Sequence, residues 1–329
     1  MIDHSRVALV GAIGGTYISL AVADIDELTV SDFALLNSAD FASPMVAIDR
    51  YLKSIPRTPA KVGLSVAGVV NDGTVTMSHL PWTFTTQDIR ASTRADHICL
   101  VNEFDALALS LPRLSRYDLV DIADGARVLH GTKLAIGAGT GFGAAAIAWT
   151  GDHWHAVSGE SRYVAMPADG SADPDAIPLT AEDAVSGRGL VTLYSELAKR
   201  RGVGVLLHAA PDITRAALAA EDDVAVEALN TTVVRLGRFA GDLALIYGAR
   251  GGVYLGGGLP SNIVSALATP RFREAFEGMG GRRDYLERIP IFAIKVGADA
   301  AMRGAAIALA QSLPASSALA ARRPASRAS

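Results

Sequence analysis

The chain has 329 residues, of which 50% are hydrophobic and 19% are charged, and its net charge is −4. This length allows one large or two medium-sized domains, each with its own core. The slightly acidic balance gives no indication of a nucleic-acid partner or of an anionic membrane surface. The start, Met1–Arg6, lacks an apolar signal core, and no apolar run could span a bilayer, so we expect a cytoplasmic protein.

The first third of the chain has the pattern of an α/β layer. Strands are predicted from short apolar runs at Val7–Val10, Ile18–Ala23, Val62–Val66 and Ile98–Val101. Helical spacing of apolar residues predicts helices at Phe41–Leu52 and from about Asp105 to Leu111, the second ended by Pro112. Within the segment Val69–Val75, Asn-Asp-Gly predicts the turn of a hairpin.

A similar order begins again near residue 133. Further strands are predicted at Lys133–Ile136, Gly143–Trp149, Gly252–Leu255 and Ile291–Val296, and helices at Gly187–Lys199, Val224–Tyr247 and Ala300–Gln311. Strand, glycine turn, strand and helix thus occur twice, which indicates duplication of one supersecondary unit. Two such α/β domains facing each other would form a cleft for a ligand.

Three glycine-rich turns follow predicted strands, at Gly11–Tyr17, Gly137–Gly143 and Gly256–Pro260. A turn without side chains lets backbone N–H groups approach an anion closely, which is how phosphates are bound. A lone turn of this kind is more often structural than a phosphate site. Three of them, spread over the whole chain, predict a nucleotide held between two halves of the protein.

Several ordered motifs extend this interpretation. They are Val10–Thr16, Leu80–Phe84, Val101–Ala108, Gly137–Gly143, Ser158–Glu160, Glu182–Leu190 and Gly251–Gly258. The ordered set resembles the bacterial glucokinase family, part of the actin-like, ribonuclease-H-like ATPase superfamily. The resemblance implies two actin-like α/β domains flanking a cleft. A small N-terminal domain would comprise residues 1–112 plus about 299–312, and a large domain residues 113–298. The Ala-, Ser-, Pro- and Arg-rich composition of residues 313–329 predicts a disordered tail.

The resemblance also implies an activity: ATP-dependent phosphorylation of glucose at its 6-hydroxyl, with Mg²⁺, by a cytoplasmic homodimer that binds neither nucleic acid nor membrane. It makes Glu103 the catalytic base. Sugar contacts would come from Asn102, Glu160, Tyr163 and Glu182. Phosphate contacts would come from Gly14, Gly15, Thr16, Gly139, Thr140, Gly141, Gly257 and Gly258, and no residue is assigned as a metal ligand.

Some positions depart from the family pattern, and they gather around the chemistry. Ala12 stands where the family has an Asp near Mg²⁺, and Glu103 stands where it has the catalytic Asp. The other departures are Tyr17, Ser19, His79 and Tyr163. Asp105 is a candidate to replace the missing carboxylate, although a first-turn acid favoured by the helix dipole explains it more simply.

Three functions therefore stay open. The chain could be a glucokinase, a non-catalytic relative that binds a sugar, a nucleotide or another protein, or a kinase for a different sugar-like substrate. Bulk at Tyr17 and Tyr163 and the charge of Arg162 would reshape the pocket in the third case. The commonest interpretation of Arg162 is an ion pair with Glu160.

Overall fold

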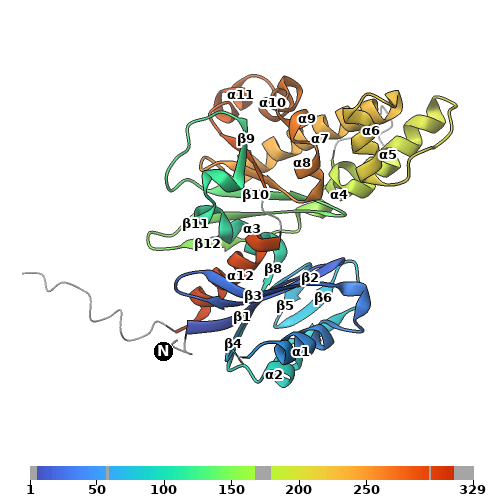
Figure 1. Cartoon of the computed structure of the whole chain (residues 1–329). Helices are drawn as coiled ribbons and strands as arrows, with labels where there is room; N and C mark the ends of the chain where they lie inside the picture. The colour runs from blue at the N-terminus through green and yellow to red at the C-terminus, as the bar shows by residue number, and fades with distance from the viewer. Residues whose placement is uncertain (1–5, 57–58, 167–178, 296–297, 315–329) are drawn as a thin grey trace, which may run out of the picture. The chain divides into compact units, whose positions relative to one another are not determined.

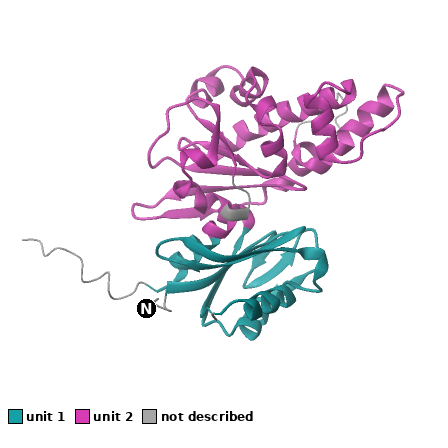
Figure 2. Cartoon of the chain, viewed as in Figure 1, with its two compact units in different colours: residues 1–102, 305–329 teal, residues 103–304 magenta. Residues whose placement is uncertain are grey.

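The computed structural model describes residues 6–56, 59–166, 179–295 and 298–314. The chain divides into two compact units, residues 1–102 with 305–329 and residues 103–304 (Figure 2). Each unit has its own apolar core. The chain passes from one unit to the other after residue 102 and again after residue 304, and these two positions are its changeover points. The domain bounds predicted from the sequence, 1–112 with about 299–312 and 113–298, lie several residues away from them. From residue 315 onward, the predicted disordered tail lies outside the described residues.

The main sheet of the first unit has five strands in the order β3-β2-β1-β4-β8 (Figure 1). Their bounds are β1 Val7–Ile13, β2 Tyr17–Asp24, β3 Thr29–Asn37, β4 Lys61–Val66 and β8 His97–Asn102. β1 and β3 run antiparallel to β2, whereas β1, β4 and β8 run parallel to one another. The four strands predicted for this part of the chain are confirmed, and the edge strand β3 is an addition.

The rest of the first unit comprises a small sheet and the helices. Its elements are β5 Gly68–Asn71, β6 Thr74–Met77, β7 Thr83–Thr85, η2 Ser38–Asp40, α1 Pro44–Ser54 and α2 Thr86–Thr93. The predicted hairpin turn is confirmed, with positive φ at Asp72 and Gly73. The first predicted helix starts later than expected, because Ser43 is its N-cap and Pro44 its first residue.

The sheet of the second unit has the order β12-β11-β10-β13-β14-β9. Its strands are β9 Leu119–Ala123, β10 Lys133–Ala138, β11 Phe142–Trp149, β12 Trp154–Val157, β13 Val253–Gly256 and β14 Ile291–Ile294. The antiparallel series β12-β11-β10 is followed by the parallel series β10-β13-β14. The first unit has the same arrangement in β3-β2-β1 and β1-β4-β8, as the predicted repeat requires.

Helices complete the second unit. Their bounds are α3 Glu103–Ser110, α4 Ala181–Val185, α5 Gly187–Arg200, α6 Ala210–Leu218, α7 Asp223–Tyr247, α8 Gly258–Asn262, α9 Val264–Leu267, α10 Pro270–Glu277 and α11 Gly281–Leu286. Short 3₁₀ turns are η3 Leu111–Arg113, η4 Arg116–Asp118 and η5 Ser161–Tyr163. α12, Ala298–Ser312, continues from this unit into the first. Even α7, which has 25 residues, is not apolar enough to cross a membrane, and no other described helix is.

The packing of α3 explains where the units change over. α3 begins at Glu103, and the ring of its second residue, Phe104, covers Gly137 and Gly143, which face each other across β10 and β11. A Cβ added at Gly143 would lie 1.9 Å from Phe104 Cε2, and one added at Gly137 would lie 2.3 Å from Phe104 Cε1. The helix therefore belongs with the second sheet, and the first unit ends at Asn102 rather than near Pro112.

Candidate active site

The first glycine turn lies between β1 and β2 and is fixed by its own backbone and by one serine. Gly14 N donates to Tyr17 O at 2.9 Å. The buried Ser38 donates twice, from its N to Thr16 O at 2.9 Å and from its Oγ to Gly14 O at 3.0 Å. These bonds hold the backbone of Gly14, Gly15 and Thr16 in one conformation without a charged side chain.

The strand positions beside the start of this turn carry alanine and serine. Ala12 pairs with Ser19 on β2 and with Ser65 on β4, and both serines are buried. Ser65 Oγ has no hydrogen-bond partner among the described residues. His79 lies beside the turn, since a Cβ added at Gly15 would come 3.3 Å from His79 Cβ. No carboxylate stands at the strand positions next to Ala12.

Asn102 ends β8, in register with Val66 at the end of β4 and hence with Ile13 at the end of β1. Its side-chain Nδ2 donates to Gly68 O at 2.9 Å, so the amide plane is oriented by the following strand, β5. The first turn and Asn102 thus share the carboxyl edge of one parallel set of strands, where α/β proteins commonly bind ligands.

The second and third glycine turns share the corresponding edge of the second unit. The strands that precede them, β10 and β13, are parallel neighbours in which Gly137 pairs with Gly256. Gly257 has φ of 90°, and a Cβ there would lie 2.5 Å from Ala138 O, so only glycine fits. Cβ atoms added at Gly139 or Gly258 would instead meet nothing within 4 Å, so both turns leave open space beside their backbone.

Glu103 lies in a cavity of about 290 Å³ next to the third turn. The cavity is lined by Glu103, Phe104, Leu107, Gly137, Gly256, Gly257, Gly258, Ser261, Ile294, Lys295 and Ala301. Burial raises the pKa of Glu103 to about 7, while the charge of Arg162 opposes this rise and that of Glu182 adds to it. A carboxyl group with a pKa near 7 is suited to proton transfer at neutral pH.

Glu160 and Tyr163 both contact Arg162. Glu160 is the N-cap residue of η5, and Arg162 Nε lies 3.0 Å from Glu160 Oε2, as the ion-pair interpretation predicted. The Arg162 guanidinium also lies 4.5 Å from the ring centroid of Tyr163, which is 66% exposed. Because Arg162 also acts on the pKa of Glu103, it links the base to the predicted sugar carboxylate, a role the sequence did not assign.

Glu182 contacts the second glycine turn. Its Oε2 accepts a hydrogen bond from Phe142 N at 3.0 Å, and its Oε1 is paired with Arg188. Arg188 Nε in turn donates to Thr140 O at 3.2 Å. Arg188 is therefore a second residue at the site that the sequence did not assign, although its presence inside the motif Glu182–Leu190 was a usable signal.

Asp105 makes a structural contact and does not face open space at the site. Its side chain is buried, and its Oδ2 accepts a hydrogen bond from Ser158 Oγ at 2.6 Å. Burial raises the pKa of Asp105, an effect that the Ser158 bond opposes. This contact joins α3 to the loop that carries Glu160, so Asp105 orients that loop.

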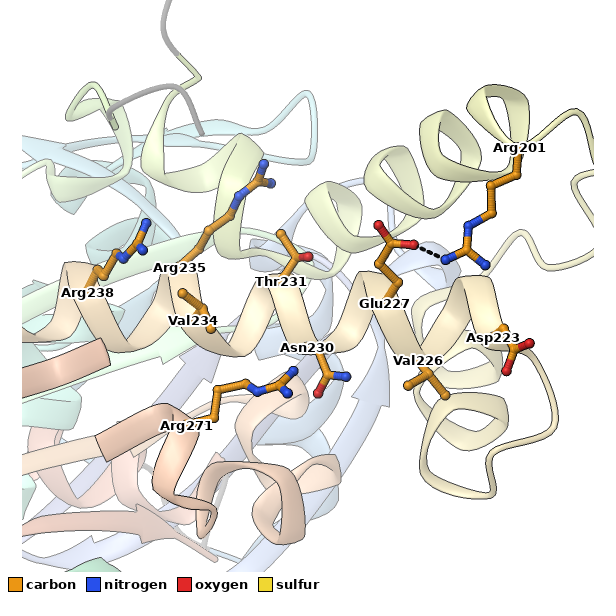
Figure 3. A pocket seen from close by; sticks show the side chains of 10 residues that line it. All are labelled: Arg201, Asp223, Val226, Glu227, Asn230, Thr231, Val234, Arg235, Arg238 and Arg271. Atoms are coloured by element: carbon orange, nitrogen blue, oxygen red, sulfur yellow. Dashed lines mark hydrogen bonds and ion pairs between the residues drawn. The ribbon is translucent and has the colours of Figure 1, made fainter. Parts of the chain in front are cut away.

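A larger groove lies on the outer face of α7 (Figure 3). It encloses about 840 Å³ and is lined by Arg201, Asp223, Val226, Glu227, Asn230, Thr231, Val234, Arg235, Arg238 and Arg271. Arg201 is paired with Glu227 there. None of the predicted site residues lines this groove.

Comparison with solved structures gives the class of protein. A glucokinase from an Antarctic psychrotroph matches with a TM-score of 0.80 and 29% identity, over 93% of this chain and 99% of that one. A ROK-family glucokinase from Streptomyces griseus, solved with glucose and AMPPNP, matches in fold with a TM-score of 0.67 and 22% identity, over 93% and 99%. The paired α/β units are those of the actin-like sugar kinases.

Sequence comparison gives the family. The glucokinase family model matches residues 9–312. The glucokinase of Nitrobacter hamburgensis is 33% identical over 300 residues, which cover 88% of this chain and 93% of that protein. The chain belongs to the glucokinase family, as the ordered motifs predicted.

Proposed function

We propose that this chain is a glucokinase that transfers the γ-phosphoryl group of ATP to the 6-hydroxyl of glucose. The observation that carries the proposal is the position of Glu103, a carboxyl group with a pKa near 7 in the cavity lined by the third glycine turn. The family match supports a sugar kinase over a non-catalytic relative.

In the proposed reaction Glu103 accepts the proton of the 6-hydroxyl as its oxygen attacks phosphorus. Phosphoryl transfer requires mainly positioning and charge stabilisation, so the backbone amides of the glycine turns would supply much of the remaining catalysis. Asn102, Glu160 and Glu182 would hold the sugar hydroxyls. Glu103 is one methylene longer than the Asp of the family pattern, and its position on the first turn of α3 would set the reach of its carboxylate.

The described residues fit a magnesium ion brought by the nucleotide better than a resident one. They contain no group of three or more His, Cys, Asp or Glu side chains that could hold a metal ion. Mg²⁺ at such sites is bound largely by substrate phosphates with one or two carboxylates. When present, the ion would neutralise phosphate charge, and the chain's own residues would contribute few of its ligands.

A coupled assay of ADP release tests the proposal. With ATP, Mg²⁺ and glucose we expect turnover in the ordinary kinase range of ~1–100 s⁻¹. Turnover with another sugar and not with glucose would correct the substrate. Absence of turnover with every sugar, together with activity gained in the Ala12→Asp/Glu103→Asp double variant, would instead identify a non-catalytic relative.

A second experiment tests whether the second turn binds phosphate through its backbone. A Cβ at Gly139 meets nothing within 4 Å, so Gly139→Ala should leave the thermal unfolding midpoint unchanged. The methyl group would stand where a phosphate approaches, and we expect the KM for ATP to rise by about tenfold, or about 1.4 kcal/mol. An unchanged KM for ATP in a folded variant would remove Gly139 from the proposed nucleotide site.

The cytoplasmic location and the homodimer stay predictions from the family resemblance. Sedimentation at micromolar concentration would test the dimer directly.

A further inference from the structure

The start of α5 holds two consecutive carbonyl groups of the second glycine turn. Gly187 N donates to Gly139 O at 2.8 Å, and Arg188 Nε donates to Thr140 O at 3.2 Å. In a planar trans peptide the N–H points away from the C=O. The N–H groups of Thr140 and Gly141, which belong to the same two peptide planes, therefore point away from α5. Adjacent amides directed to one side form an anion-binding concavity.

Glu182 fixes the far end of the same turn. Phe142 N donates to its Oε2 at 3.0 Å, and Arg188 is paired with its other oxygen. Glu182 is itself well placed, because a capping box between Thr180 and Asp183 sets the first turn of α4. Together, Arg188 and Glu182 thus hold the turn at two places, Thr140 and Phe142.

These contacts differ from those of an ordinary surface ion pair, which contributes little. The Glu182 side chain is only 19% exposed, and the arginine bonds a backbone carbonyl as well as the carboxylate. A guanidinium can make both bonds at once because its donors lie in a rigid planar fork. The second bond would be lost with a lysine, whose single ammonium cannot reproduce that fork.

We propose that Arg188 is a positioning residue for the nucleotide: with Glu182 it orients the peptide planes that present the amides of Thr140 and Gly141 to the phosphates of ATP. The proposal rests on the proposed function, in which this turn binds ATP. Glu182 then serves the nucleotide side of the site, beside its predicted sugar contact.

The test is the dissociation constant for ATP, measured by calorimetry without sugar on the full chain. Arg188→Ala should weaken binding at least about tenfold, a difference of about 1.4 kcal/mol, and Arg188→Lys by a smaller factor. Arg215→Ala is the matched control, because Arg215 is an exposed arginine of the same unit, on α6, that pairs with Glu221 at 3.1 Å. It should bind ATP as the wild type does.

Kinetics and hydrogen exchange separate this proposal from its alternatives. In Arg188→Ala the KM for ATP should rise with the dissociation constant while the KM for glucose stays nearly constant. A raised KM for glucose with unchanged ATP binding would overturn the proposal and assign Arg188 to the sugar side through Glu182.

Hydrogen exchange of segment 137–143 without ligand should be faster in Arg188→Ala, whether or not phosphate is transferred, and unchanged exchange would also overturn the proposal. If the wild-type chain bound no ATP but exchange were still faster in the variant, the proposed function would be overturned. Arg188 would then still order the turn, but not for a nucleotide.

Discussion

Replacing Glu103 by Gln is expected to lower kcat with glucose by about 10²–10⁴-fold, the usual contribution of a general base. The amide keeps the size of the side chain but cannot accept the proton. In the wild type, kcat/KM should rise with pH and level off above pH 7, because burial raises the pKa of Glu103 to about 7 and only the carboxylate is active. A Glu103→Gln enzyme with more than a tenth of wild-type kcat would exclude this residue as the base.

The same substitution is expected to stabilise the fold at alkaline pH. The pKa of Glu103 rises from 4.5 to about 7, so the folded state holds the proton more tightly than the unfolded one. Wild-type stability should therefore fall as pH rises between these values, by up to about 3 kcal/mol. Glu103→Gln lacks this loss, and its unfolding midpoint should exceed that of the wild type at pH 8 but not at pH 4. Glu221→Gln, on the exposed Arg215 pair, is the control.

Replacing Gly143 by Ala is expected to damage both stability and catalysis. The added Cβ would lie 1.9 Å from Phe104 Cε2, and the ring has no room toward Gly137 on the other side. Overpacking of this kind costs about 1–3 kcal/mol. Because Phe104 follows Glu103 directly, the ring's displacement should also move the base, and a misplacement of about 1 Å can lower the rate on the order of 10²-fold.

Thermal unfolding and kcat measured on one set of variants test this expectation. Phe104→Leu combined with Gly143→Ala should recover part of the lost stability, because the smaller side chain makes room for the methyl group. Gly281→Ala is the control, since a Cβ at Gly281 meets nothing within 4 Å. If Gly143→Ala matched this control in both measurements, Phe104 would not be what positions α3.

The sequence was sufficient for most strands and for the turns between them. Apolar runs such as Val62–Val66 lie in a sheet centre, where burial on both faces favours apolar residues, and they matched β4 closely even though this run includes the buried Ser65. Asn-Asp-Gly requires positive φ and therefore marked its hairpin locally. The family motifs predicted the order of Glu103 and the three glycine turns along the chain. In the second unit, parallel strands bring the second and third turns to one sheet edge, and Glu103 lines a cavity with Gly137 and Gly257.

Features that depend on contacts between residues far apart in the sequence could not be predicted from local patterns. Gly143 looks like one more glycine of a phosphate turn, yet it is small because a ring 39 positions earlier covers it. Arg188 looks like a solvated helix residue until its bond to Thr140, 48 residues away, is seen. The pKa of Glu103 likewise arises from burial and from the charges of Arg162 and Glu182, which no local pattern contains.

The two changeover points of the chain have a consequence for its synthesis. The second unit is one continuous stretch, residues 103–304, set between the two parts of the first unit. All five strands of the first sheet precede residue 103, but the first unit also includes the part of α12 from Ala305 onward, whose backbone closely approaches β4 at Gly63. On the ribosome, the second unit can therefore finish folding before the first, contrary to the usual N-terminal-first order. A nascent chain stalled before Ala305 would contain a complete second unit and a first unit that still lacks the end of α12.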